Sequence, residues 1–382
     1  MMDRFPPPAD EQVTLTNWRT APFSRWAFRH VRELIPSAEI PHDPAAVRPL
    51  PEAPVPVPGF DGMAEDCDAL LVLHRGRVVA ERYGEGIIAT TPHILMSVSK
   101  SMLGLLAGIL AEAGRLDVEA PVADYVPEVA ETVYRGATVR HLLDMRVGIL
   151  FDEDYLATSG PIVAYRQATG WNPVDPAEPP SDLRSFYARL TEADGRHGQR
   201  FHYVSTNSDL LAWVIERASG ERYADLMGRL LWAPAGTERP AYITVDRLGA
   251  PRAAGGMCVA ARDLARIGQL IVENGSRNGR QVLPQCWIDD IERAGDPEAW
   301  DAGDFAPFFP GRAMHYRSQC YVLRGENPLI FGIGIHGQNL YVDRRTEVVV
   351  VRLSSRALPL DADRELSGLE EALTIRDFLA GN

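Results

Sequence analysis

Residues 97–110 join a polar start to an apolar run, and this segment most constrains the fold of the chain. If it is a helix, residues three apart lie on one face, so the Ser97 hydroxyl and the Lys100 amine can share a hydrogen bond. The apolar face of the same helix would desolvate the amine and lower its pKa toward neutrality. The segment therefore predicts a serine nucleophile beside its own lysine base. It reads Ser97-Val98-Ser99-Lys100-Ser101-Met102-Leu103-Gly104-Leu105-Leu106-Ala107-Gly108-Ile109-Leu110.

The Ser-x-x-Lys spacing does not identify an enzyme by itself, because serine followed by lysine one turn later is also ordinary at a helix start. Ser97 has a second possible chemical role, which depends on its backbone. A backbone N–H at a helix start is unpaired, so that of Ser97 can stabilise a negatively charged oxygen. Ser97 is thus a candidate nucleophile and oxyanion donor, with Lys100 as the candidate base.

Further segments extend this motif. They are Thr91 to Met102, Gly114-Arg115-Leu116-Asp117-Val118, Pro121-Val122-Ala123-Asp124-Tyr125-Val126-Pro127, Thr138 to Ile149 and Ala254 to Leu270. In order and spacing they resemble the serine β-lactamase and penicillin-binding-protein superfamily over roughly residues 60–380. The resemblance is nearest to its branch of 6-aminohexanoate-dimer hydrolases and class C-like carboxylesterases. It implies an antiparallel sheet built from both chain ends and flanked by helices, plus a mostly helical region.

The hydrophobic pattern also favours an α+β fold. Residues 67–74 and 77–83 are predicted strands that form a hairpin around the turn Arg75-Gly76. A second strand pair, 338–342 and 347–353, brackets a turn and is followed by a final helix at 363–379. Helical periodicity lies between these strands. We expect an N-terminal helix near 24–34 and a proline-rich strap within residues 1–60. The hydrolase domain spans 61–382, with a sheet region at about 61–95 and 310–382 and a helical region at about 96–310.

A second candidate catalytic element lies in Phe201-His202-Tyr203-Val204-Ser205. It resembles the tyrosine motif of the superfamily, which implies that Tyr203 relays a proton between nucleophile, lysine and leaving group. Protonated Lys100 would lower the pKa of Tyr203. A half-buried core tyrosine is the alternative. The resemblance implies that Ser205 contacts the substrate. It stands where the family usually has asparagine, which puts recognition of a lactam side chain in doubt.

The third candidate element is Phe331-Gly332-Ile333-Gly334-Ile335-His336-Gly337. The resemblance aligns the motif glycine with Gly334 and leaves Gly332 where lysine or histidine is expected, so the cation for a substrate carboxylate is missing. The Ile335 N–H would be the second oxyanion donor, and His336 would line the pocket. The same stretch spells G-x-G-x-x-G, but no helix follows it, which excludes a dinucleotide site.

The substrate loop is expected around Tyr155. The resemblance to the dimer-hydrolase branch implies that Tyr155 hydrogen-bonds the substrate amide nitrogen and that Trp171 lies nearby. The acid that would hold a substrate ammonium is absent, because the corresponding position is Arg166. Strong activity on that dimer is therefore doubtful, and the acids at 152–154 are equally suited to a solvated surface.

Composition limits the partners. The net charge of −13 and a pI near 5.2 disfavour nucleic acid and anionic membranes. The N-terminal residues lack the apolar region of a secretory signal, so we expect a cytoplasmic location. The four cysteines are widely spaced and no histidine cluster has metal-ligand spacing, so we expect free thiols and neither metal nor cofactor.

The sequence thus predicts a serine hydrolase that cleaves short carboxylic esters or small linear amides through an acyl-enzyme. Alternatives are a 6-aminohexanoate-oligomer amidase, a β-lactamase or D-Ala-D-Ala peptidase, and a non-catalytic binding module of the same fold. The acyl group, the leaving group and the oligomeric state stay open.

Overall fold

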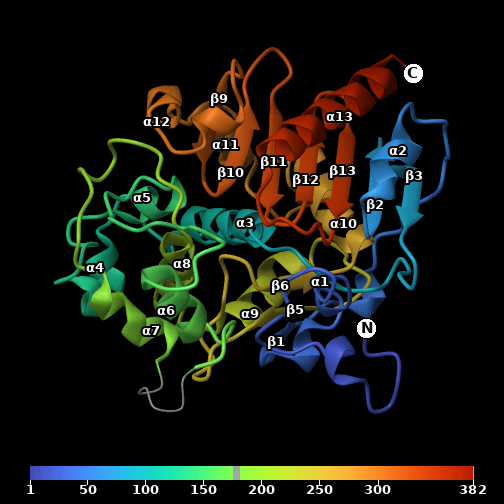
Figure 1. Ribbon diagram of the computed structural model, residues 1–382. Coiled ribbons are helices and arrows are strands. Elements are labelled where there is room, and N and C mark those ends of the chain that lie inside the picture. Colours follow the sequence, from blue (N-terminus) through green and yellow to red (C-terminus); the bar gives the residue numbers. More distant parts are fainter. Residues whose placement is uncertain (175–180, 382) are drawn as a thin grey trace.

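The computed structural model describes residues 1–174 and 181–381, and a seven-stranded antiparallel sheet dominates it (Figure 1). Strands from both ends of the chain pair within this sheet, where β2 lies beside β13. This arrangement matches the predicted α+β architecture. In spatial order the strands are β3 (Arg77–Tyr83), β2 (Ala69–His74), β13 (Val348–Leu353), β12 (Gln338–Asp343), β11 (Leu329–Gly334), β10 (Cys320–Leu323) and β9 (Met314–Arg317).

Both faces of the large sheet are covered. Leu71 and Val349 point into the main core, where α10 (Ala261–Val272) packs against β13, β12 and β2. Leu70 and Val350 belong to a second core. Helix α13 (Ala362–Ala380) covers that face of the sheet (Figure 1). A strand buried on both faces has no polar side, which explains the unbroken apolar run in β2.

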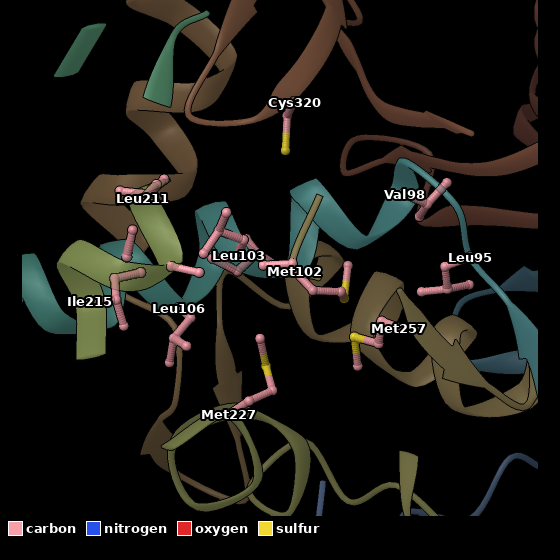
Figure 2. Packing of buried hydrophobic residues seen from close by; sticks show 14 of the residues in the cluster. Leu95, Val98, Met102, Leu103, Leu106, Leu211, Ile215, Met227, Met257 and Cys320 are labelled. Carbon is pink, nitrogen blue, oxygen red and sulfur yellow. The ribbon is translucent and has the colours of Figure 1, made fainter. Parts of the chain in front are cut away.

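Helix α3 (Val98–Glu112) runs between the sheet and the helical region. Figure 2 shows Leu211 and Ile215 of α8 (Ser205–Ser219) beside Leu103 and Leu106 of α3. The remaining helices are α1 (Ser24–Ala27), α2 (Phe60–Glu65), α4 (Val122–Tyr125), α5 (Val139–Leu143), α6 (Pro161–Ala168), α7 (Leu183–Phe186), α9 (Tyr223–Met227), α11 (Gln285–Arg293) and α12 (Pro297–Asp301). None of the helices in the described ranges is long and apolar enough to cross a membrane.

A glycine lets α3 approach the sheet closely. A Cβ on Gly104 would lie 2.0 Å from the carbonyl oxygen of Ser318, in the turn between β9 and β10. Only a residue without a side chain tolerates that distance. Gly104 therefore determines how closely α3, the helix that carries the candidate catalytic residues, packs against the sheet.

The N-terminal segment joins a smaller four-stranded sheet. Its strands, in order, are β1 (Ser37–Ile40), β5 (Ala241–Thr244), β6 (Met257–Val259) and β4 (His93–Ile94); β7 (Ser276–Arg277) and β8 (Arg280–Gln281) form a separate hairpin. The helix expected near 24–34 is broken into α1 and a 3₁₀ turn at Val31–Glu33. The Phe28 carbonyl accepts a hydrogen bond from Ile94 N–H at 2.9 Å, which takes that carbonyl out of a continuous helix.

Candidate active site

The chain turns sharply between β4 and α3, and Ser97 lies in that turn. Leu95 N–H donates to the Met257 carbonyl at 2.8 Å, which anchors the approach to the turn on β6. Met96 then adopts a positive φ of 45°, uncommon for a residue with a side chain. Ser97 follows as the N-cap of α3. Strand pairing on one side and helix packing on the other thus fix the position of Ser97.

Lys100 is buried one turn into α3 and is 1% exposed. Its Nζ lies 2.8 Å from Ser97 Oγ, 3.0 Å from Ser205 Oγ and 2.7 Å from the Ala254 carbonyl oxygen. Burial lowers the pKa of Lys100 to about 7, although the carboxylate of Glu153 acts in the opposite direction. The structure thus brings together the predicted serine and lysine, with the amine close to half-neutral at physiological pH.

An ionic network holds the Ala254 carbonyl against Lys100. Asp209 Oδ1 accepts from Ala254 N–H at 2.8 Å, and its Oδ2 accepts from Arg252 Nη1 and the Tyr165 hydroxyl, both at 2.5 Å. Arg252 also donates to the Tyr165 hydroxyl. Sequence reasoning missed this network. The one sign of this network in the sequence is Asp209, a charged residue that interrupts the apolar periodicity of α8.

Tyr203 lies beside the pair. Lys100 Nζ is 4.8 Å from the centre of its ring, and its hydroxyl interacts with that of Ser97. Burial of the phenol raises the pKa of Tyr203, with a further rise from the carboxylate of Glu153. The expected lowering of the pKa of Tyr203 is therefore wrong, because burial of the phenolate is the dominant effect.

Ser205 begins α8 and faces Lys100 on one side and Glu153 on the other. Its hydroxyl donates to Glu153 Oε1, and its N–H donates to Glu153 Oε2 at 2.5 Å. Ser205, expected to contact substrate, thus also connects Lys100 to a carboxylate. Glu153 was not singled out in the sequence, where it lies within the acids at 152–154; a single carboxylate facing inward cannot be recognised in such a run.

The end of β11 passes close to Ser97. A Cβ on Gly334 would lie 2.5 Å from the Leu95 carbonyl oxygen and 3.0 Å from Ser97 N. Across the described chain, neither Ser97 N–H nor Ile335 N–H donates to a backbone carbonyl. Gly332 faces α3, since its Cβ would lie 2.8 Å from Ser101 Oγ. The two proposed oxyanion donors are therefore free and on adjoining segments.

Two cavities flank the candidate residues. The smaller, of about 30 Å³, is lined by Ser97, Ser205, Ile335, Tyr155 and Trp171 among others. The larger, of about 440 Å³, is lined by Tyr155, Tyr203, His202 and the acids Asp152, Glu153, Asp154, Asp194 and Asp304. The structure thus brings the predicted Tyr155 and Trp171 to the site.

His336 lies outside both linings. Its Nδ1 is 2.7 Å from the Arg356 carbonyl oxygen, and its ring packs edge-on against Phe28. Burial lowers the pKa of His336 to about 4. Its surroundings are those of a neutral core histidine. In the part of the chain that the structure describes, no group of three or more metal-binding side chains occurs.

Comparison with known proteins shows the family of the chain. Residues 60–373 match the Beta-lactamase family, so the chain belongs to that family. A 6-aminohexanoate-dimer hydrolase from Paenarthrobacter ureafaciens is 38% identical over 379 residues, which cover 97% of this chain and 95% of that protein. Family and relative together identify the protein as a serine hydrolase rather than a non-catalytic module.

Solved structures support the fold. A Bacillus anthracis structure that bears the 6-aminohexanoate-dimer hydrolase name aligns with a TM-score of 0.87 at 26% identity and covers 98% of both chains. EstCE1, a hydrolase with promiscuous acyltransferase activity, aligns with a TM-score of 0.63 at 18% identity, covering 85% of this chain and 97% of the other. The predicted β-lactamase-like fold is confirmed.

Proposed function

We propose that the protein hydrolyses short carboxylic esters, and small linear amides more slowly, through an acyl-enzyme on Ser97. Ser97 Oγ attacks the carbonyl carbon while its proton passes to Lys100 Nζ. The negative charge on the carbonyl oxygen is stabilised by the N–H groups of Ser97 and Ile335. The leaving alcohol or amine takes a proton through Tyr203, and water then hydrolyses the ester on Ser97.

One observation carries this proposal, namely the contact between Lys100 and Ser97. A lysine amine at its ordinary pKa of 10.5 is protonated at neutral pH and cannot accept a proton. Burial brings the pKa of Lys100 to about 7 while the amine stays 2.8 Å from the serine oxygen. A base with a pKa near the working pH is the one best suited to general-base catalysis.

Tyr203 fits the role of proton donor to the leaving group. Its raised pKa keeps the phenol protonated, so it has a proton to give. It also lines the larger cavity, from which a leaving group can depart. Lys100, which took the proton of Ser97 and lies with its Nζ 4.8 Å from the centre of the Tyr203 ring, returns that proton to Tyr203.

A 6-aminohexanoate-oligomer amidase is the second candidate, because of the 38% identical relative that bears that name. Tyr155 lines both cavities, where it can reach a substrate nitrogen. Arg166 lines the small cavity beside Ser97, and its positive charge disfavours an acyl chain that ends in ammonium. Esters therefore remain the first choice.

A β-lactamase or D-Ala-D-Ala peptidase is disfavoured. Gly332 supplies no cation for the carboxylate of a lactam, and three arginines of the neighbouring strands and loops that could replace it are ion-paired elsewhere. Arg312 contacts Glu370, Arg317 contacts Asp290 at 2.8 Å, and Arg352 contacts Glu371.

The test is covalent labelling with an ester-mimicking fluorophosphonate, followed by intact mass and peptide mapping. We expect one adduct, on Ser97, and none in Ser97→Ala. Ser101→Ala is the matched control, since Ser101 is on the same helix but its hydroxyl is bonded to the Gln319 carbonyl at 3.1 Å. Label on another residue, or persistence of the adduct in Ser97→Ala, would refute the assignment.

A further inference from the structure

Three arginines line the small cavity beside Ser97. Arg19 comes from the N-terminal segment that precedes the family match, Arg166 from α6, and Arg252 from the loop between β5 and β6. They converge from distant parts of the sequence onto a space of about 30 Å³. Such convergence of cations at a catalytic serine points to an anionic ligand.

The cavity has an excess of positive charge. Arg252 is paired with Asp209. Arg166 donates to the backbone carbonyls of Asp154 at 2.8 Å and Ala157 at 3.1 Å, and Arg19 donates to the Asn172 side chain at 2.5 Å. Within the described ranges neither Arg19 nor Arg166 has a carboxylate at salt-bridge distance.

One carboxylate, that of Glu153, also lines the cavity. It already accepts hydrogen bonds from the N–H and hydroxyl of Ser205. With Glu153 and Asp209 counted against the three arginines, one positive charge is left over even when Lys100 is neutral. The cavity lining therefore lacks one anion.

Burial makes this excess costly. Arg166 is 6% and Arg252 7% exposed, and the Nε atoms of Arg19 and Arg252 are buried with no hydrogen-bond partner in the described chain. Desolvation and the two neighbouring arginines lower the pKa of Arg19 to about 9. Buried unpaired charges and donors are unfavourable, so an anion that entered the cavity would offset both costs.

The position of Tyr203 indicates which part of the substrate, the acyl group or the leaving group, enters the small cavity. The leaving group must lie near its proton donor, and Tyr203 lines the larger cavity but not the small one. Ser97 and Ile335, which would hold the carbonyl, line the small cavity. The small cavity is therefore on the acyl side.

We propose that the small cavity binds a carboxylate at the end of a short acyl chain, so that the preferred substrates are half-esters and half-amides of short dicarboxylic acids. This inference rests on the proposed function, because the acyl group must be delivered to Ser97. A space of about 30 Å³ holds roughly two water-sized groups, which suits the two oxygens of a carboxylate. A chain ending in ammonium would meet the same excess charge and be rejected.

The first experiment compares kcat/KM for two esters of equal size. 4-Nitrophenyl glutarate ends in a carboxylate, and 4-nitrophenyl 5-oxohexanoate ends in a methyl ketone. We expect the glutarate to be preferred by about tenfold to a hundredfold, as charge-assisted hydrogen bonds to buried arginines imply. Equal rates, or preference for the ketone, would overturn the proposal.

Substitutions of the cavity arginines test whether the preference for glutarate arises in the small cavity. Arg19→Gln and Arg166→Gln should each reduce the ratio of glutarate to ketone rates by about tenfold, and Arg166→Lys should retain more of it than Arg166→Gln. Arg25→Gln, an exposed arginine of the same N-terminal segment, should leave the ratio unchanged. A ratio insensitive to both Arg19 and Arg166 would refute the site.

A second ester pair tests the acyl-side assignment. 4-Acetoxybenzoate carries its carboxylate on the leaving group, and 4-acetoxyacetophenone is its neutral counterpart. We expect no preference for the charged member. A preference as large as that for glutarate would overturn the assignment.

A binding measurement separates this inference from the proposed function. In Ser97→Ala, glutarate should cause a saturable change in tryptophan fluorescence through Trp171, which lines the cavity, and neutral glutaramide should not. Loss of the glutarate signal in Arg166→Gln would assign it to the site. If no ester is cleaved but glutarate binds, the proposed function fails and the anion site stands. If esters are cleaved and glutarate does not bind, the anion site alone fails.

Discussion

The amine of Lys100 lies 2.8 Å from the hydroxyl oxygen of Ser97, within hydrogen-bond distance. The same low-dielectric surroundings that hold the pKa of Lys100 near 7 also raise that of Tyr203. Desolvation disfavours the charged form of each group. One physical cause thus yields a neutral base and a protonated acid side by side.

The pH dependence of acylation follows from this pair. Ser97 can be activated only by the neutral amine, so kcat/KM for 4-nitrophenyl acetate should rise with pH through an apparent pKa of about 7 and level off above it. Glu153, Asp209 and Arg252 surround the amine and contribute to its pKa. A steady-state profile from pH 5 to 9 tests this. A flat profile would mean that a different group accepts the proton.

Lys100 should also make stability depend on pH. Its pKa is about 7 in the folded protein and ordinarily 10.5, so between these values the unfolded chain binds more protons. The wild type should therefore gain stability relative to Lys100→Met as pH rises from 7 to 10, by up to about 1.4 kcal/mol per pH unit. Urea unfolding of both proteins at pH 7 and 9 measures the change. A constant difference would show that burial does not shift this lysine.

Tyr203→Phe should slow amides more than activated esters. An amine must be protonated as it leaves, whereas 4-nitrophenolate departs without a proton, so loss of the phenol hydroxyl affects the two unequally. The loss on an anilide should be about a hundredfold or more, the range typical of general acid catalysis, and smaller on the nitrophenyl ester. Matched kcat values for both substrates provide the test. Equal losses would reduce Tyr203 to a packing role.

The sequence predicted the sheet and the Ser97 helix because both have strong local signals. The hairpin of β2 and β3 around the turn at Arg75-Gly76 and the apolar run of α3 are read from neighbouring residues alone. The interrupted helix at 24–34 was not predicted, because the Phe28 carbonyl is taken by a residue on β4, far along the chain.

The charged groups around the site were missed for a related reason. Asp209 and Arg252 matter only as a pair, and Arg19 reaches the cavity from a segment outside the family match. Nothing in the local sequence of Arg19 or Arg252 distinguishes either residue from a surface charge, and the one local signal is Asp209, which interrupts the apolar periodicity of α8. Only the tertiary packing brings them together.

Gly334→Ala should impair the oxyanion site. The added methyl would lie 2.5 Å from the Leu95 carbonyl oxygen and 3.0 Å from Ser97 N, so the strand must move away from the helix start. Displacing one oxyanion donor typically lowers kcat by about 10²–10³. The control is Gly114→Ala, where the added methyl has open space, although its positive φ adds strain to the backbone. Full activity in Gly334→Ala would exclude the Ile335 N–H as a donor.

Selectivity against β-lactams should follow from the shape and charge of the site. The small cavity of about 30 Å³ cannot hold the acylamino side chain of a cephalosporin, and Ser205, bonded to Glu153, offers no amide to bind it. Gly332 supplies no cation on the inner strand, and the loss of one charge-assisted hydrogen bond costs about 1.5–3 kcal/mol. We therefore expect nitrocefin to be hydrolysed at least tenfold to a hundredfold more slowly than the best short ester, measured as kcat/KM with one enzyme preparation. Nitrocefin turnover equal to that of the best ester would show that a cation elsewhere in the site replaces the missing side chain at Gly332.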